Sequence, residues 1–167
     1  MVTITVDIDD QVKEHFNKFI EEHGIEVDPS DLAQAKREIA QIRETNADGY
    51  ILDQVHNLEA MMTMVEDKVW KIKKVNMEKI NATIKYFVDD DVIPDNTPGI
   101  GYLDDCIIID STMDDIYEEL VEFQDFCRTR LVYAHDEKFD FDDWQKIKNQ
   151  EATSRVRNRM RNRTRRR

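Results

Sequence analysis

Four aspartates lie close together in the chain, and their residue type and spacing suit a hard divalent cation. They fall in the segment 86–110, YFVDDDVIPDNTPGIGYLDDCIIID, and are Asp91, Asp95, Asp104 and Asp105. Carboxylate oxygens are the ligands that Mg²⁺, Mn²⁺ and Ca²⁺ prefer. Carboxylates gathered without a counter-ion would repel one another. A divalent-metal-binding module, or a metal-dependent enzyme, is therefore one hypothesis, although the ligand spacing is not that of an EF-hand.

The same aspartates also suit a structural role at helix ends. Pro94 keeps Ile93 out of helical geometry, so a helix before it should end by Val92. Asp104 is placed to act as the N-cap of a helix that starts near Asp105. We favour this capping role, at a corner between two antiparallel helices, over metal binding. An acidic surface for a protein partner is a third alternative.

A second group with evident chemistry is the C-terminal sequence RVRNRMRNRTRRR, residues 155–167. It holds eight of the 24 basic residues and no acidic one, so the rest of the chain carries 16 basic and 36 acidic residues. Guanidinium groups bind phosphates without regard to base sequence. We expect contact with RNA or DNA through Arg155, Arg157, Arg159, Arg161, Arg163, Arg165, Arg166 and Arg167. The alternatives are an acidic protein surface, of this chain or of a neighbouring subunit, and an anionic membrane surface.

No pattern of a known catalytic site is present. HExxH, GxSxG and the P-loop are absent, as is GxGxxG after a strand. The four histidines are scattered, and Cys106 and Cys127 have neither CxxC spacing nor an adjacent histidine. We therefore expect a non-enzymatic binding or adaptor protein that needs no cofactor, the alternative being a divalent cation such as Mg²⁺ or Ca²⁺.

The elements that position these groups are predicted to be mainly helical, because the chain has only four Gly and three Pro. Val2–Ile8 is the exception, since its alternation of β-branched and polar residues predicts a strand, paired within the chain or with a second copy in a homodimer. A helical face follows, with Asp9 or Asp10 as N-cap and Gly24 as stop. The next helix is expected to begin with Ser30 as its N-cap.

Later segments have the apolar spacing of longer helices. A 4-3-4-3 spacing from Ile51 to Ile72 predicts a bundle helix with a methionine-rich core face, the alternative being a dimer seam. After a break near Lys73–Asn76, apolar residues continue to Phe87. Beyond the Pro/Gly-rich stretch at 94–101, a further helix is predicted with an apolar stripe of Ile116, Leu120, Phe123, Cys127 and Leu131.

The predicted fold class is thus mainly α, a helical bundle with a short N-terminal β-strand and a basic C-terminal tail. We divide it into residues 1–46 (strand and two helices), 47–139 (helical core) and 140–167 (a helix opening with an acidic cap at Asp140–Trp144, then the tail). The tail is expected to be disordered, a helical extension being the alternative. The chain has no apolar run of membrane-spanning length, no signal peptide and two cysteines, so a reduced, cytoplasmic protein is expected.

The segment 86–110 resembles the YkvA-like domain of unknown function, a small bacterial helical domain. The family pattern is matched in order by Tyr86, Asp91, Ile93, Pro94, Asp95, Pro98, Gly101, Tyr102, Leu103, Asp104 and Asp105. It departs at Asp89–Asp90, where the family usually has Ser-Pro, so the turn at the helix end should differ. The resemblance implies a helix–corner–helix element and no particular chemistry.

The N-terminus bears a weaker resemblance to ribbon-helix-helix proteins, dimeric regulators in which the outward strand residues enter the major groove of DNA. Those residues would be Thr3, Thr5 and Asp7. Residues 1–46 hold five basic and eleven acidic residues, a balance that opposes binding to phosphates. A dimeric regulator of this type is therefore kept only as an alternative.

Overall fold

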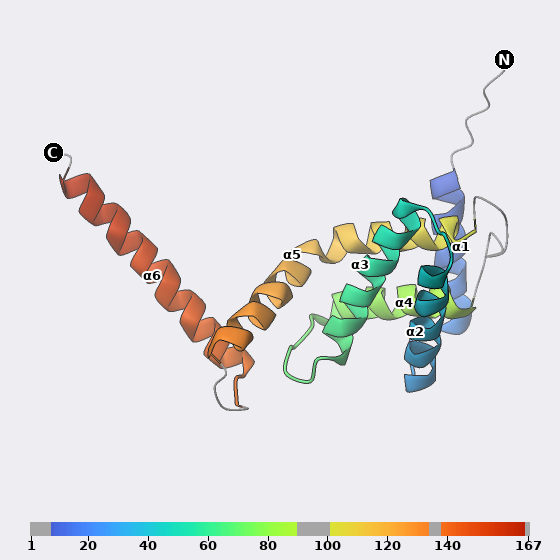
Figure 1. Ribbon diagram of the computed structural model, residues 1–167, viewed down its shortest axis with the longest axis horizontal. Coiled ribbons are helices and arrows are strands. Elements are labelled where there is room, and N and C mark those ends of the chain that lie inside the picture. Colours follow the sequence, from blue (N-terminus) through green and yellow to red (C-terminus); the bar gives the residue numbers. More distant parts are fainter. Residues whose placement is uncertain (1–7, 90–100, 134–137, 166–167) are drawn as a thin grey trace, which may run out of the picture. The chain divides into compact units, whose positions relative to one another are not determined.

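The computed structural model describes residues 8–89, 101–133 and 138–165, and these form six helices and no strand (Figure 1). In chain order the helices are α1 (Ile8–His23), α2 (Pro29–Glu44), α3 (Gly49–Glu66), α4 (Lys74–Asp89), α5 (Leu103–Tyr133) and α6 (Phe141–Arg165). The prediction of a mainly helical protein is confirmed. None of the helices in these ranges is both long enough and apolar enough to cross a bilayer.

The described residues divide into two compact units. The first unit holds residues 8–66 and 72–120, and the second holds residues 67–71 and those from 121 onward. Helix α5 contributes its first part, through Leu120, to the first unit and its remaining residues to the second. The division into three segments that the sequence suggested stays a prediction.

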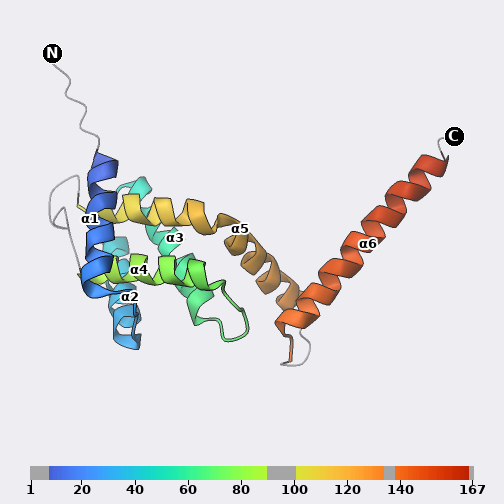
Figure 2. The ribbon, with the colours of Figure 1, turned by 180° about the vertical axis from the view of Figure 1, so that it is seen from behind.

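In the first unit, α4 contacts α1, α2 and α3, and α2 also contacts α3 (Figure 2). Helix α1 lies against the C-terminal half of α4, where the fully buried ring of Tyr86 meets two α1 rings edge to face. The ring centroids of Phe16 and Phe19 are 5.4 and 5.6 Å from that of Tyr86. Val12 and Ile108 complete this cluster, so α1, α4 and α5 share one core.

The start and the end of α1 show how the local sequence sets helix boundaries. Gly24 has a φ of +75° and donates its backbone N–H to the carbonyl of Ile20 at 2.9 Å, so it ends the helix as predicted. Asp9 and Asp10 lie in the first turn, after Ile8, and neither is the N-cap. The predicted strand covered residues 2–7, which lie outside the described residues, and Ile8, which is helical; for Ile8 the prediction is wrong.

Helix α2 begins two residues earlier than predicted. Its N-cap is Asp28, whose carboxylate accepts the backbone N–H groups of Ser30 (2.6 Å) and Asp31 (3.0 Å). Asp31 returns a bond by accepting the N–H of Asp28, which completes a capping box. Pro29 then occupies the first helical position, where no N–H is needed. The choice of Ser30 as N-cap was therefore wrong.

Helix α3 has the buried face that its spacing predicted but is shorter than expected. Met61, Met62 and Met64 are all buried in the first unit, which confirms the core assignment. The helix ends at Glu66 because Asp67 accepts the N–H groups of Val69 and Trp70 at 2.9 and 3.0 Å and turns the chain. The last part of the predicted helix, to Ile72, is therefore not helical.

The second unit is built around Trp70. The rings of four aromatic residues lie with their centroids 5.2–5.6 Å from that of Trp70; they are Phe123, Phe126, Phe141 and Trp144. Phe126 rather than Cys127 is fully buried on this part of α5, and Leu131 is 86 % exposed. The predicted apolar stripe is therefore not buried as far as Leu131, because the buried face of α5 turns toward this aromatic cluster.

Candidate functional site

The arginine-rich segment is carried by α6, and the start of this helix is well anchored. Asp143 donates its backbone N–H to Asp140 at 2.9 Å, and Asp140 donates its own to the Asp143 carboxylate at 3.3 Å. This reciprocal pair confirms the acidic cap predicted at Asp140–Trp144. One turn on, the indole Nε1 of Trp144 donates to Asp125 of α5 at 2.9 Å. The first turn of α6 is thus held by capping and by packing together.

From this anchor α6 continues as a helix through Arg165, which is the alternative that the sequence offered for the tail; its disorder stays a prediction. Arg166 and Arg167 lie outside the described residues. Val156 and Met160 are 51 % and 64 % exposed, so no apolar contact holds the distal part of the helix. Its helical state rests on continuity with the anchored start and on arginine's good helix propensity.

The helix arranges the arginines in two rows. Successive residues of an α-helix are about 100° apart, so residues four apart lie on nearly the same face. Arg155, Arg159 and Arg163 therefore form one row, and Arg157 and Arg161 form a second row on about the opposite side. The position of Arg165 continues the second row. The sequence shows the alternate spacing of the arginines, but only the helix turns it into two rows.

The guanidinium groups of these rows are available to a ligand. All side chains from 152 to 164 are exposed. Within the second unit, Arg155 makes a 3.9 Å ion pair with Glu151 on its own helix. Arg157, Arg159, Arg161 and Arg163 form no ion pair with any other described residue. The rows are thus a concentrated positive charge with little internal compensation.

The predicted aspartate cluster is described only in part. Asp91 and Asp95 lie outside the described residues, whereas Asp104 and Asp105 lie in the first turn of α5 and are almost fully buried. Tyr86 Oη donates to Asp104 Oδ2 at 3.2 Å. Since α5 begins at Leu103, Asp104 is not the N-cap that the sequence suggested.

The metal hypothesis therefore stays a prediction. In the ranges that the structure describes, no three or more His, Cys, Asp and Glu side chains are grouped so that they could hold a metal ion.

The residue before α5 is Tyr102, which has a φ of +66° and whose carbonyl accepts the first helical N–H, from Cys106, at 2.9 Å. This turn positions the two buried aspartates at the start of the helix.

Neither cysteine has the surroundings of a nucleophile. Burial, together with the neighbouring carboxylates of Asp105, Asp104 and Asp110, raises the pKa of the Cys106 thiol to about 12. Burial also raises the pKa of Cys127, although Arg130 opposes this effect. Both thiols are protonated at neutral pH, so the described residues offer no thiolate for catalysis.

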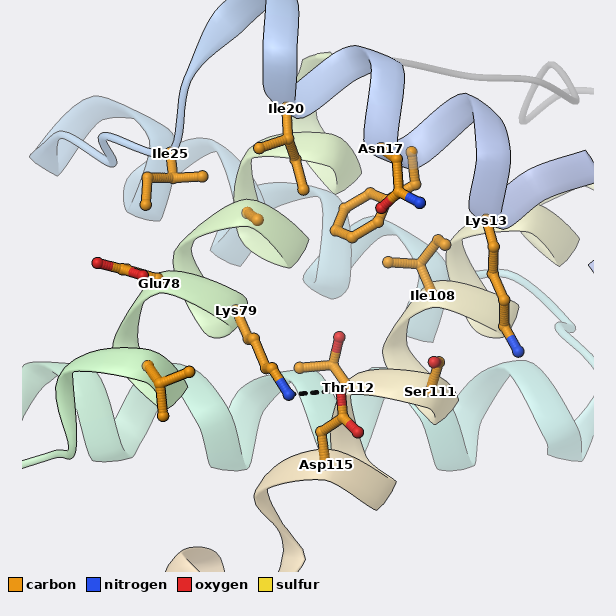
Figure 3. A pocket seen from close by; sticks show the side chains of 13 residues that line it. Lys13, Asn17, Ile20, Ile25, Glu78, Lys79, Ile108, Ser111, Thr112 and Asp115 are labelled. Carbon is orange, nitrogen blue, oxygen red and sulfur yellow. Dashed lines mark hydrogen bonds and ion pairs between the residues drawn. The ribbon is translucent and has the colours of Figure 1, made fainter. Parts of the chain in front are cut away.

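A second candidate site is a groove in the first unit, under α1, which we call the α1 groove. It has a volume of about 470 Å³ and lies between α1, α4 and α5 (Figure 3). Its apolar lining is formed by Phe16, Ile20, Ile25, Val75, Ala82 and Ile108. Sequence reasoning missed this groove. The only available signal was the helical repeat of Lys13, Phe16 and Ile20, which does not reveal a distant partner such as Ser111.

Comparisons with known proteins give no match: no protein-family model, no curated protein and no solved structure is similar to this chain. The resemblances to the YkvA-like domain and to ribbon-helix-helix proteins stay predictions. The class that the described residues define is an all-helical protein with an arginine-bearing terminal helix.

Proposed function

We propose that this protein is a non-enzymatic nucleic-acid-binding protein that holds phosphates with the arginines of α6. The observation that carries the proposal is the pair of exposed arginine rows on opposite sides of one helix. A nucleic-acid duplex has phosphates along both walls of each groove. A helix with side chains is about 10–12 Å across, close to the roughly 12 Å width of the major groove of DNA. Each row would then meet one wall.

The charge of the rest of the chain supports the assignment of phosphate binding to α6. Outside residues 155–167 the chain carries 36 acidic and 16 basic residues, so its body repels phosphate. Binding should therefore depend on α6 alone and should weaken steeply with salt, because each neutralised phosphate releases counter-ions. Arginine suits this role better than lysine because its planar guanidinium binds a phosphate with two parallel hydrogen bonds.

The test is a salt titration of the full-length chain with a labelled DNA duplex, an RNA duplex and a single strand, followed by fluorescence anisotropy. A variant with four arginines neutralised should lose most of its affinity. For B-DNA, each phosphate contact contributes about 0.9 to the slope of log K against log salt, so the slope should shrink by about 3 to 4. The substitutions are Arg157→Gln, Arg159→Gln, Arg161→Gln and Arg163→Gln.

A matched control removes the same charge elsewhere, from four lysines that are all exposed. This control should leave the slope within about one unit of the wild type, because one contact contributes about that much. Equal losses in the two variants would show that net charge, not α6, governs binding. Tight, salt-sensitive binding to an acidic protein but not to nucleic acid would favour the alternative partner. The control substitutions are Lys68→Gln, Lys71→Gln, Lys73→Gln and Lys74→Gln.

A further inference from the structure

The α1 groove has hydrogen-bond donors at one end, and Ile25 lies near Glu78 at the other. In Figure 3, Lys13 and Asn17 of α1 and Ser111 of α5 lie toward one end, while Ile25 lies at the other. Between these ends Ile20 points from α1 into the groove, and the buried Ile108 of α5 lies nearer the end with Lys13. The groove therefore presents hydrogen-bond donors at one end of an apolar channel, which is the polarity of an amphipathic ligand.

Among the described residues, the Lys13 ammonium that lines the groove has no counter-ion. Two acidic residues line it, and both are already paired: Asp115 with Lys79, Nζ to Oδ2 2.8 Å, and Glu78 with Lys74 at 3.7 Å. No hydrogen bond or ion pair joins the Lys13 ammonium to another described residue, and Asn17 and Ser111 line the same end of the groove. This end therefore favours an anionic group.

We propose that the α1 groove binds a linear alkyl carboxylate. Its carboxylate lies at Lys13, where the Asn17 amide and the Ser111 hydroxyl are further donors, and its chain lies along Ile20 and Ile108 toward Val75. The groove lies wholly within the first unit, and no residue of α6 lines it.

The size of the groove suits such a ligand. Lys13 and Ile20 are seven residues apart on α1, which corresponds to about 10 Å along the helix axis. A volume of about 470 Å³ falls in the usual range of small-molecule sites. Burying an alkyl chain contributes about 0.8 kcal/mol for each methylene, so a medium chain supplies most of the affinity and the carboxylate supplies the orientation.

The test is isothermal titration of the full-length chain with decanoate below its micelle concentration, beside decanol and decyltrimethylammonium. Decanoate should bind saturably at one site and more tightly than either analogue. Lys13→Glu should weaken decanoate about tenfold, because it turns an attraction into a repulsion of similar size. The same variant should strengthen binding of decyltrimethylammonium. Lys13 is exposed, so the substitution leaves the core intact.

The matched control is Lys18→Glu, an identical charge change on the same helix at a lysine that does not line the groove. It should change the affinity for decanoate less than twofold. Val75→Asp, at a position 57 % exposed, should weaken decanoate as Lys13→Glu does, since it places a charge beside the alkyl chain. Equal effects of Lys13→Glu and Lys18→Glu, tighter binding of the cationic analogue to the wild type, or no saturable binding would each overturn the proposal.

Discussion

Glu119 of α5 accepts a hydrogen bond from Asn76 of α4: Asn76 Nδ2 lies 2.5 Å from Glu119 Oε2. The other carboxylate oxygen, Oε1, accepts the backbone N–H of Lys73 at 2.9 Å, just before α4 begins at Lys74. Glu119 is only 2 % exposed, so these two bonds satisfy a carboxylate that has left water. One buried side chain of α5 thus caps α4 and ties the two helices together within the first unit.

Replacing Glu119 by leucine should destabilise the first unit by about 2–4 kcal/mol, because the buried Asn76 amide and the part-buried N–H of Lys73 lose their acceptors. Glu119→Gln should cost less, since a flipped Asn76 amide can accept from glutamine while glutamine accepts from Lys73. Urea unfolding, monitored by far-ultraviolet circular dichroism, measures the loss of stability in both variants. Glu118→Leu, at an exposed position, is the control and should stay within about 0.5 kcal/mol of the wild type. Equal losses at positions 118 and 119 would contradict this role.

Asp67 should make the stability of the second unit sensitive to acid. Burial alone would raise the pKa of Asp67, but hydrogen bonds from Arg130 and from the N–H groups of Trp70 and Val69 outweigh burial and lower it below its ordinary 3.8. A carboxylate with a lowered folded pKa stabilises the fold above its unfolded pKa and loses that effect as the pH falls through the folded value. The contribution of Asp67 should therefore be complete at neutral pH, begin to fall near pH 3.8 and disappear as the pH falls through the lower pKa of the folded state.

The measurement compares wild type with Asp67→Asn in urea unfolding at pH 7 and near pH 3. Both tryptophans, Trp70 and Trp144, belong to the second unit, so their fluorescence reports on it alone. The variant should be less stable at pH 7, and the difference in free energy of unfolding between the two proteins should be smaller near pH 3. Asp142→Asn, exposed on α6, should show no such pH-dependent gap. A gap that stays constant with pH would show that the Asp67–Arg130 ion pair does not stabilise the unit.

The helices were predictable where a periodic apolar face was not interrupted by a side chain that hydrogen-bonds to the backbone. Met62 and Ile80 are buried as their spacing required, because burial of a regular stripe dominates helix packing. The ends were less predictable, since each depends on one short-range choice. Asp28 displaced Ser30 as a cap, and Asp67 ended α3 although apolar residues continue in register beyond it. Such side-chain-to-backbone bonds compete with the helix and leave no trace in a hydrophobic pattern.

The candidate sites were predictable to different degrees. The arginines of α6 were evident from composition, but their helical arrangement was not, because exposed residues such as Met160 give the distal helix no apolar face. The α1 groove could not be predicted at all. It brings Lys13 and Ser111 together from helices almost one hundred residues apart, and that proximity depends on the packing of α1 against α4 and α5. A local pattern carries no such information.

The two cysteines should differ in reactivity. Cys106 is 2 % exposed with a pKa of about 12, so about one molecule in ten thousand carries its thiolate at pH 8. Cys127 is only half-buried and should react first, although its raised pKa keeps the reaction slow. Iodoacetamide labelling of the native protein, read by peptide mass spectrometry, should modify Cys127 alone, and both thiols should react in urea. Rapid native labelling of Cys106 in a Cys127→Ser variant would contradict its burial.

Trp144 should control how firmly α6 is held in the second unit. Trp144→Ala removes a ring that is only 9 % exposed and lies against Trp70, and should cost about 3–5 kcal/mol. Trp144→Phe keeps a ring but loses the Nε1 bond to Asp125, which should cost about 1 kcal/mol. In both variants Trp70 is the remaining tryptophan, and its emission during urea unfolding gives the two losses. Equal losses would mean that the ring does not pack as described. Because the arginine rows lie beyond Glu151, Trp144→Phe should bind nucleic acid with an unchanged salt slope.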